Sequence, residues 1–332
     1  MVDPLLLLAP LAVAALGFAF EVIGQRHDAS RFPAPGKRVR VANTHLHVRT
    51  RGEGSPVIVL EAGAGGWSTH WDPLIGPLSE LSKVIAYDRA GLGWSAGGEA
   101  PRSADCAARE LSELLRQVSP ESTKVILVAH AEGARIARSF AIRYPHKTEG
   151  LVFVDGYHES LEPSLQREGI PSPCVSTTML AGLMWAGRLG LLRLLRYPPL
   201  APGLEETPLG HANLQTIAAL SRSPRVLAGM HAEQKASGES DEKLAAHPTD
   251  QQTPCRTLVA GASLPAAGLP EGFPLGEFNS IWAQSSAKLS AGFSGGPESA
   301  DVLEDADHLL PLRHPQAVVA CVRDLLERGT ES

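Results

Sequence analysis

The stretch that decides the fold reads Val125-Ile126-Leu127-Val128-Ala129-His130-Ala131-Glu132-Gly133-Ala134. Its first four residues are β-branched or leucine, which is typical of a short buried strand. A helical pattern follows over 132–144 and stops at Pro145. A chain that turns from strand to helix within a few residues needs small side chains for close approach, and Ala129 and Gly133 supply them. The sequence therefore predicts a tight strand–turn–helix unit with Ala131 at its centre.

Strand-like and helix-like segments alternate on both sides of this turn. Apolar strand patterns cover 57–60, 84–87 and 151–154, and helical patterns cover 71–81 and 103–118. Short apolar strands that alternate with helices are typical of a mostly parallel sheet flanked by helices. We therefore predict an α/β fold, in which functional side chains follow the carboxyl ends of the strands.

The alternation breaks between residues 160 and 253. Residues 179–197 are apolar with three interspersed arginines, and we interpret them as part of a helical cap over a pocket, with a membrane-surface helix as the alternative. Residues 237–252 are polar, which predicts a loop. The predicted division of the chain is a hydrophobic anchor (1–24), a linker (25–37), a first core part (38–159), the cap (160–253) and a second core part (254–329).

The N-terminal segment is strongly apolar. Residues 4–20 carry no charge, which is a length at the lower limit for crossing a bilayer. Residues 1–3 contain no Lys or Arg, which disfavours a cleaved signal peptide. We therefore predict membrane attachment through residues 4–24, with secretion after signal peptide cleavage and a helix buried in the protein as the alternatives. Basic residues follow the segment, so the positive-inside tendency places the main domain on the cytoplasmic side.

Charge and metal-ligand content limit the possible partners. The 332-residue chain has a net charge of -6, which argues against nucleic acid as a partner because phosphate binding depends on clustered Lys and Arg. The four cysteines form no CxxC pair and no zinc spacing. His45 and His47 share one face of a strand-like stretch, but no third ligand is evident. We predict neither a metal nor another cofactor.

From residue 38 to residue 328 the chain resembles the α/β-hydrolase superfamily. The resemblance rests on Asp88-Arg89-Ala90-Gly91-Leu92-Gly93-Trp94-Ser95 after one strand and on Ala129-His130-Ala131-Glu132-Gly133-Ala134 after the next. Members of the similar branch read Asp-Arg-x-Gly-x-Gly-x-Ser and Gly-His-Ser-x-Gly-Gly at these places. The first motif is nearly complete. In the second, Ala131 stands where the family has its nucleophilic serine.

The resemblance also implies partners for that position. His308 follows the last strand pattern and matches the catalytic histidine of the family. The usual position of the acid, around Ser263, holds no carboxylate. Asp155 ends the apolar strand 151–154 and is the candidate acid, with capping of a backbone turn as the alternative. Glu271 and Glu277 are more remote candidates.

The oxyanion hole that the resemblance implies is built from backbone amides. Its donors correspond to the amides of Ala64 and Glu132. Backbone donors do not depend on side-chain identity, so the resemblance implies a hole even without a serine. The Glu132 side chain adds a carboxylate beside the turn, where it favours the helix dipole or takes part in acid–base chemistry.

A methyl group at position 131 cannot attack a carbonyl. Loss of the nucleophile costs on the order of 10⁶ in turnover. Three functions remain open: a protein of ester or acyl hydrolase ancestry for apolar small molecules, a pseudohydrolase that binds a lipid, small molecule or protein, and a cofactor-free lyase or oxygenase that uses His308 as a base. Whether the chain is an enzyme therefore remains open at the level of sequence.

Overall fold

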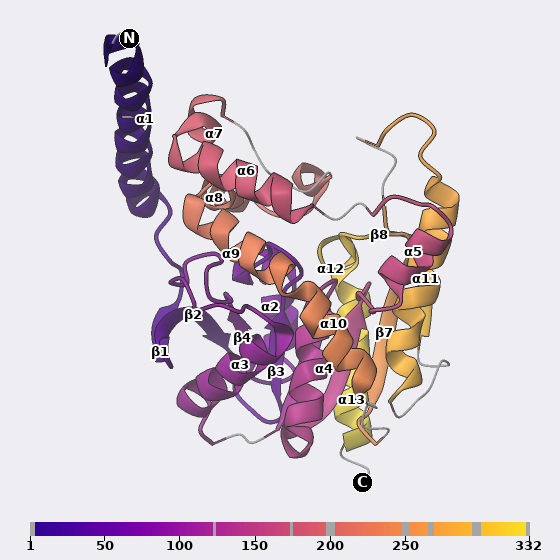
Figure 1. Ribbon diagram of the computed structural model, residues 1–332. Coiled ribbons are helices and arrows are strands. Elements are labelled where there is room, and N and C mark those ends of the chain that lie inside the picture. The colour runs from indigo at the N-terminus through magenta and orange to yellow at the C-terminus, as the bar shows by residue number, and fades with distance from the viewer. Residues whose placement is uncertain are drawn as a thin grey trace.

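An eight-stranded sheet runs through the molecule in the order β1-β2-β4-β3-β5-β6-β7-β8 (Figure 1). A computed structural model describes residues 4–121, 124–172, 175–196, 203–247, 252–264, 269–293 and 300–329. The strands are β1 (Lys37–Val41), β2 (Thr44–Arg51), β3 (Val57–Glu61), β4 (Val84–Tyr87), β5 (Val125–His130), β6 (Thr148–Val154), β7 (Cys255–Ala262) and β8 (Ala300–Asp307). Strand β2 pairs antiparallel with β1 and β4, and the pairs from β4 to β8 are parallel. The predicted α/β fold with a mostly parallel sheet is confirmed.

Helices cover both faces of this sheet, because each central strand is apolar on both sides. In β5, Val125 and Leu127 belong to one core cluster, whereas Ile126 and Val128 belong to the other. Helices α3, α4 and α11 contribute to the first cluster, and α2, α12 and α13 contribute to the second. Their bounds are α2 Asp72–Ser79, α3 Ala104–Val118, α4 Gly133–Arg143, α11 Leu275–Ala291, α12 Leu310–Arg313 and α13 Pro315–Gly329. Near-continuous apolar strands are what such a two-sided burial requires.

A run of helices is inserted between β6 and β7. It comprises α5 (Leu161–Arg167), α6 (Thr177–Arg188), α7 (Leu191–Leu194), α8 (His211–Ser221), α9 (Pro224–Lys235) and α10 (Ser237–Ala246). We call these the inserted helices. Figure 1 shows α6 to α8 above the sheet, and residues of α6, α8 and α9 line the same cavity as residues that follow β3 and β5. These helices lie over the carboxyl ends of the parallel strands, where sites in such folds form.

The predicted loop over residues 237–252 is wrong for its first part, because Ser237–Ala246 forms helix α10. Two side chains of this helix are buried: Leu244, and Ser240, whose Oγ accepts a hydrogen bond of 3.0 Å from the amide of Ala104. The exposed side of the helix is polar, so the average composition concealed the narrow buried face. Residues 248–251 lie outside the described residues.

The N-terminal segment forms helix α1 (Pro4–Arg31), which therefore extends seven residues into the predicted linker. The prediction of a membrane anchor over residues 4–24 is wrong. Within the parts of the chain that the structure describes, no helix combines the length and the apolar content needed to cross a membrane. The predicted location of the main domain depended on this anchor and falls with it.

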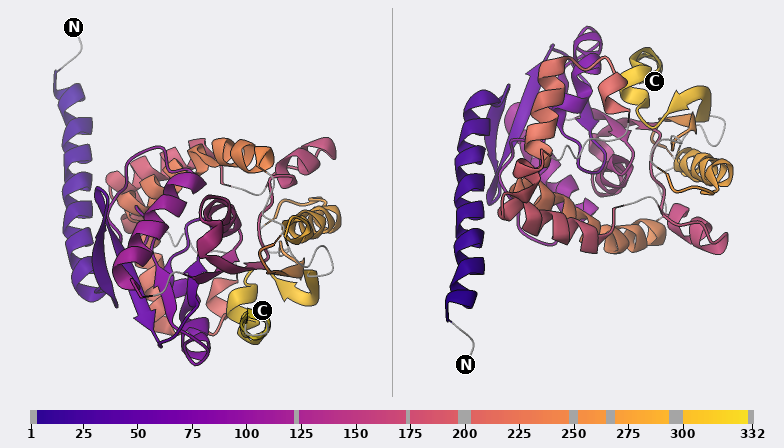
Figure 2. Two further views of the ribbon diagram at one scale, coloured as in Figure 1. Left: turned by 90° about the horizontal axis from the view of Figure 1, so that it is seen from below. Right: turned by 90° about the horizontal axis from the view of Figure 1, so that it is seen from above.

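The physical basis of this correction lies in the second half of α1. Glu21 and Asp28 are buried there, at 2% and 8% exposure, against Arg193 of α7. The counted apolar run ended at Phe20, but the helix continues through charged residues that pack on protein. Figure 2 shows α1 along one side of the molecule in both views.

Candidate active site

The turn between β5 and α4 brings Ala131 to the carboxyl end of the sheet. Ala131 has φ 49°, a left-handed conformation that is uncommon for a residue with a side chain, and is 1% exposed. At Gly133, a Cβ atom would lie 2.6 Å from the carbonyl oxygen of Glu61 and 2.8 Å from that of Ala62. Since backbone cannot yield, only glycine fits at position 133. The predicted strand–turn–helix unit is thus present.

Asp155 and His308 meet beside this turn although 153 residues separate them along the chain. Asp155 directly follows β6, and His308 directly follows β8. The Nδ1 atom of His308 lies 2.7 Å from Oδ2 of Asp155. Ala131 and His308 both line one cavity. The structure therefore brings together the three side chains that the sequence analysis singled out.

The Asp155 carboxylate is fully buried and fully hydrogen-bonded. Its Oδ1 atom accepts hydrogen bonds from the amide of Ala260 at 3.1 Å, from Oγ of Ser263 at 2.9 Å and from Nε1 of Trp282 at 3.0 Å. Oδ2 remains for His308. These partners offset the cost of burying a carboxylate. Ser263, which occupies the usual acid position of the family, serves here as a donor to Asp155.

The charge state of His308 follows from these neighbours. Burial disfavours the imidazolium form, but the hydrogen bond and the charge of Asp155, with a further contribution from Glu132, outweigh it and raise the pKa of His308 above 6.5. Burial, together with the nearby charge of His308, lowers the pKa of His130 to about 3. The site therefore holds one neutral imidazole and one that binds a proton readily.

His130 and Trp282 are site residues that the sequence analysis did not single out. Nε2 of His130 donates to the backbone oxygen of His308 at 2.8 Å, and the two rings lie 4.6 Å apart. The Trp282 ring stands edge-on to that of His308 at 5.3 Å. The position of His130 directly before Ala131 was a usable signal. Trp282 lies in the middle of α11, where no local motif marks it.

The predicted oxyanion donors lie around a second carboxylate. The backbone amide of Ala64 donates to Oε2 of Glu132 at 3.1 Å. Burial raises the pKa of Glu132, but Arg135, His308 and the amide of Ala64 together lower it below its usual value of 4.5. An ionised side chain therefore occupies the amide of Ala64, which the sequence analysis predicted as an oxyanion donor.

Arg89 of the Asp-Arg motif braces the loop that carries Ala64. Its guanidinium donates to the carbonyl oxygens of Ala62 at 2.5 Å and of Gly63 at 2.9 Å. It also pairs with Glu61 at 2.8 Å and with Glu233 of α9 at 2.8 Å. Arg89 is 3% exposed. Arg89 thus holds the loop after β3 in place and connects it to α9 of the inserted helices.

A cavity of about 710 Å³ opens above these residues. The inserted helices and the loops before α11 and α12 supply apolar walls, with Met179, Leu180, Leu183, Leu227, Met230 and Leu309 among the lining residues. Charged residues on the wall have partners in the protein: Arg89 pairs with Glu233, Arg102 with Glu110 and Arg135 with Asp241. The cavity therefore presents mostly apolar surface, and its polar groups gather at the floor.

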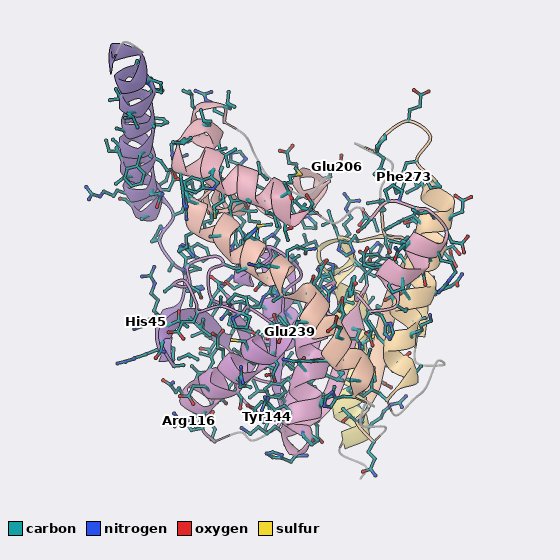
Figure 3. All side chains as sticks on the ribbon, viewed as in Figure 1. His45, Arg116, Tyr144, Glu206, Glu239 and Phe273 are labelled. Atoms are coloured by element: carbon teal, nitrogen blue, oxygen red, sulfur yellow. The ribbon has the colours of Figure 1, made fainter. Side chains whose placement is uncertain are left out.

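The two histidines of β2 have different surroundings. His47 is buried and its Nδ1 lies 2.9 Å from Asp88, whereas His45 is exposed and lies on the outer surface near β2 (Figure 3). Among the residues placed by the structure, no three His, Cys, Asp or Glu side chains lie where they could hold a metal ion. His47 thus has a structural partner in the Asp-Arg motif.

The sheet order, the tight turn at Ala131 and the histidine after the last strand together define the α/β-hydrolase class. The chain belongs to the alpha/beta hydrolase family, whose sequence profile matches residues 58–321. Among relatives, a putative carbamate hydrolase RutD from Agrobacterium fabrum is 32% identical over 117 residues, which are 35% of this chain and 43% of that protein. The uncharacterized protein YqjL from Bacillus subtilis is 34% identical over 105 residues, 32% of this chain and 41% of YqjL. These alignments span about two fifths of the relatives' length.

Solved structures agree on the fold over most of the chain. A putative epoxide hydrolase from Pseudomonas aeruginosa superposes with a TM-score of 0.63 at 19% identity, covering 90% of this chain and 98% of that one. A thermophilic esterase from Thermogutta terrifontis gives a TM-score of 0.60 at 20% identity, covering 89% of this chain and 99% of that one. At these identities the structural likeness shows the α/β-hydrolase fold alone. The hydrolase ancestry of the chain is supported by the family match.

Proposed function

We propose that the chain binds an apolar small molecule with an acyl group in the cavity and that it has lost the serine route of its family. The position of Ala131 carries this proposal: it sits at the positive-φ turn after β5, on the wall of the cavity that also exposes His308. In this proposal Ala131 occupies the nucleophile position, His308 is the family's base and Asp155 its acid.

The chemistry of the serine route explains why the change matters. A serine at position 131 would attack a carbonyl carbon while His308 accepted its proton, and Asp155 would stabilise the resulting imidazolium. The methyl group of Ala131 has neither a lone pair nor a proton to transfer. The first covalent bond of that route therefore cannot form. The cavity and the oriented His308–Asp155 pair at its floor support binding of a ligand without that step.

The nature of the cavity supports an apolar ligand. Its walls are mostly aliphatic, and the arginines on them are already paired with carboxylates. An anionic ligand would meet Glu132 at the floor, whereas a neutral ester or amide would not be repelled. The relatives named as hydrolases and the esterase with the same fold are consistent with an acyl-type ligand by ancestry.

A second candidate function is base-catalysed turnover that needs no nucleophile. The 2.7 Å contact between His308 and Asp155 favours it, because an oriented imidazole can remove a proton from a bound substrate. The raised pKa of His308 places the neutral, basic form at higher pH. Under this candidate His308→Ala abolishes turnover, whereas a protein that only binds its ligand keeps binding after the same change.

Restoring the serine tests the main proposal. The unaltered chain, Ala131→Ser and Ala131→Ser/His308→Ala are compared for hydrolysis of p-nitrophenyl butyrate and octanoate and for labelling by a fluorophosphonate. We expect no label on the unaltered chain, labelling and hydrolysis faster by roughly 10³-fold or more for Ala131→Ser, and loss of both in the double variant. Rapid hydrolysis with labelling by the unaltered chain would contradict the proposal. So would a folded Ala131→Ser protein that never takes the label.

A further inference from the structure

A buried cluster of charges joins α1 to the inserted helices. Arg193, in α7, donates through Nε and Nη2 to the two carboxylate oxygens of Glu21, at 2.9 and 3.2 Å. Through Nη1 it donates to Oδ2 of Asp28 at 2.8 Å. Both carboxylates are buried, and Arg193 itself is largely shielded. Arg193 thus compensates two carboxylates that are withdrawn from water, and Arg222, the residue after α8, adds a second positive charge close to both. We call the side chains of Arg193, Glu21 and Asp28 the α1 clamp.

Three residues of α1 surround the guanidinium of Arg193. Glu21, Gly24 and Asp28 are spaced by three and four residues, so they form a single stripe along one face of the helix. A Cβ atom at Gly24 would lie 2.2 Å from Nε of Arg193. The absence of a side chain at Gly24 leaves room for the guanidinium of Arg193, and Glu21 and Asp28 supply the negative charge on either side of it along the helix.

The other end of the connection reaches the cavity. Helix α7 follows α6 after a break at Gly190, which has φ 71°. Met179, Leu180 and Leu183 of α6 line the cavity wall. Helix α1 packs against both α6 and α7, and Figure 1 shows α7 beside it. A displacement of α7 away from α1 would therefore move part of the cavity wall.

The neighbouring helix α9 is attached differently. Arg225 of α9 donates to the carbonyl oxygens of Gly91, Gly93 and Ser95, and Glu233 pairs with Arg89. These partners belong to the loop after β4, so α9 is tied to the sheet itself. Helix α7 is instead held by the ion pairs of Arg193 with Glu21 and Asp28 of α1. Helix α6 also packs extensively on α9, so the helices over the cavity are supported from the sheet through α9 and from α1 through the α1 clamp.

We propose that α1 governs entry to and exit from the cavity by holding α6 and α7 in place through the α1 clamp, so that Arg193, Glu21 and Asp28 are positioning residues for ligand access. The proposal rests on the proposed function in one respect, namely that the cavity binds an apolar small molecule. In this proposal, the N-terminal helix supports α6 and α7 and thereby affects how a ligand enters and leaves the cavity.

Substitutions that remove charge but change side-chain size little test the role of these ion pairs separately from the packing of α1 on α6 and α7. Removing Arg193 alone leaves two buried carboxylates without their hydrogen-bonded cation and with only the Coulombic attraction of Arg222, which is unfavourable. They regain water when α7 separates from α1, so the separated state becomes populated. Removing all three charges together removes that penalty, since replacing a complete buried ion pair by neutral groups is often tolerated, and the half-buried Arg222 that remains can reach water.

The experiment compares the unaltered chain, Arg193→Met, and Glu21→Gln/Asp28→Asn/Arg193→Met. Arg256→Met, which breaks a partly exposed pair between β7 and Asp324 of α13, is the matched control. Stopped-flow fluorescence gives association and dissociation rates of Nile red, counting only the signal that excess decanol displaces. Hydrogen exchange reports opening of α6 and α7. We expect Arg193→Met to raise both the exchange and the dissociation rate by roughly tenfold or more, and the triple variant and the control to stay within about twofold of the unaltered chain.

Several outcomes would overturn the proposal. Unchanged exchange and unchanged rates in folded Arg193→Met would do so, and so would a triple variant that opens as readily as Arg193→Met. If Arg193→Met fails to fold, Glu21→Gln/Asp28→Asn takes its place, because the long side chain of Arg193 then has to find water and α7 should open in the same way. If the unaltered chain does not bind Nile red in the cavity, the proposed function fails, and exchange in α6 and α7 alone decides whether the α1 clamp holds them.

Discussion

The backbone amide of Ala64 donates to the carboxylate of Glu132 at 3.1 Å, so an amide proposed as an oxyanion donor already holds an anion. The side chain belongs to the residue next to Ala131, and its lowered pKa keeps it ionised. An acyl oxygen that develops negative charge would have to displace it. A serine placed at position 131 would therefore meet a hole that is partly occupied.

This contact predicts an interaction between two substitutions. Ala131→Ser should gain hydrolysis, and Ala131→Ser/Glu132→Gln should be faster again by roughly tenfold, because one oxyanion donor is worth roughly 10² to 10³ in turnover when fully available. Rates of p-nitrophenyl butyrate hydrolysis measure the difference. Glu113→Gln in the same background, an exposed change on α3, should leave the rate unaltered. Equal rates for the single and double variants would show that Glu132 does not compete for the amide.

The Asp155–His308 contact predicts a pH dependence. The pKa of His308 is raised, so its proton stabilises the folded chain fully below pH 6.5, and this stabilisation is lost as the pH rises through the higher folded pKa. In Asp155→Asn the charge is gone, burial prevails, and the pKa of His308 should fall below that of the unaltered chain. NMR titration of the His308 ring measures both values. A midpoint that does not fall in Asp155→Asn would contradict the assigned cause.

The close approach at Gly133 predicts a steric limit on the turn. Gly133→Ala should lower the free energy of unfolding by about 1–3 kcal/mol, because the new methyl group meets two backbone carbonyls that cannot move aside. Thermal or urea denaturation measures the change. Gly182→Ala is the matched control: it lies within α6 with open space around the added atom, and it should stabilise slightly. A Gly133→Ala protein as stable as the unaltered chain would refute the steric argument.

The brace at Arg89 predicts a larger loss. Arg89→Met removes the partner of buried Glu61 and should destabilise the fold by about 3–5 kcal/mol, the usual cost of leaving a buried charge unpaired. Chemical denaturation gives the value. The comparison is Arg116→Met, which breaks an exposed pair with Glu113 and should change stability by less than about 1 kcal/mol. Similar losses in both variants would mean that burial of the Arg89 pair is not what matters.

The sequence predicted those parts of the molecule that local patterns determine. The strand–turn–helix over 125–134 needed only an apolar run and small residues, and the alternation around it predicted the sheet. The pairing of Asp155 with His308 across 153 residues was not a local property. It was expected only through a resemblance to a family, and the structure places the two side chains in contact.

The wrong or missing predictions share one cause: the composition of a segment does not show which of its side chains are buried or which distant groups they contact. Residues 4–20 were counted as an apolar run, but the helix continues to Arg31 and packs through Glu21 and Asp28. Residues 237–246 were read as a loop because two buried side chains disappear in a polar average. Trp282 was missed because its importance comes from a partner 127 residues away. Which distant groups meet is decided by tertiary packing, and composition does not record it.

The four hydrogen-bonded neighbours of Asp155 have a consequence for how the site is read. Its carboxylate joins the end of β6 to β7, to helix α11 and to the residue after β8. Loss of this side chain would leave the Ala260 amide and the Trp282 indole without this acceptor in a buried site, and the Ser263 hydroxyl with only its longer bond to the carbonyl oxygen of Ala260. Asp155 is therefore a joint of the architecture, and its persistence in a chain without a serine requires no catalytic task. Under the proposed function, an aspartate of the former catalytic site is retained for its structural role, because the fold depends on its hydrogen bonds.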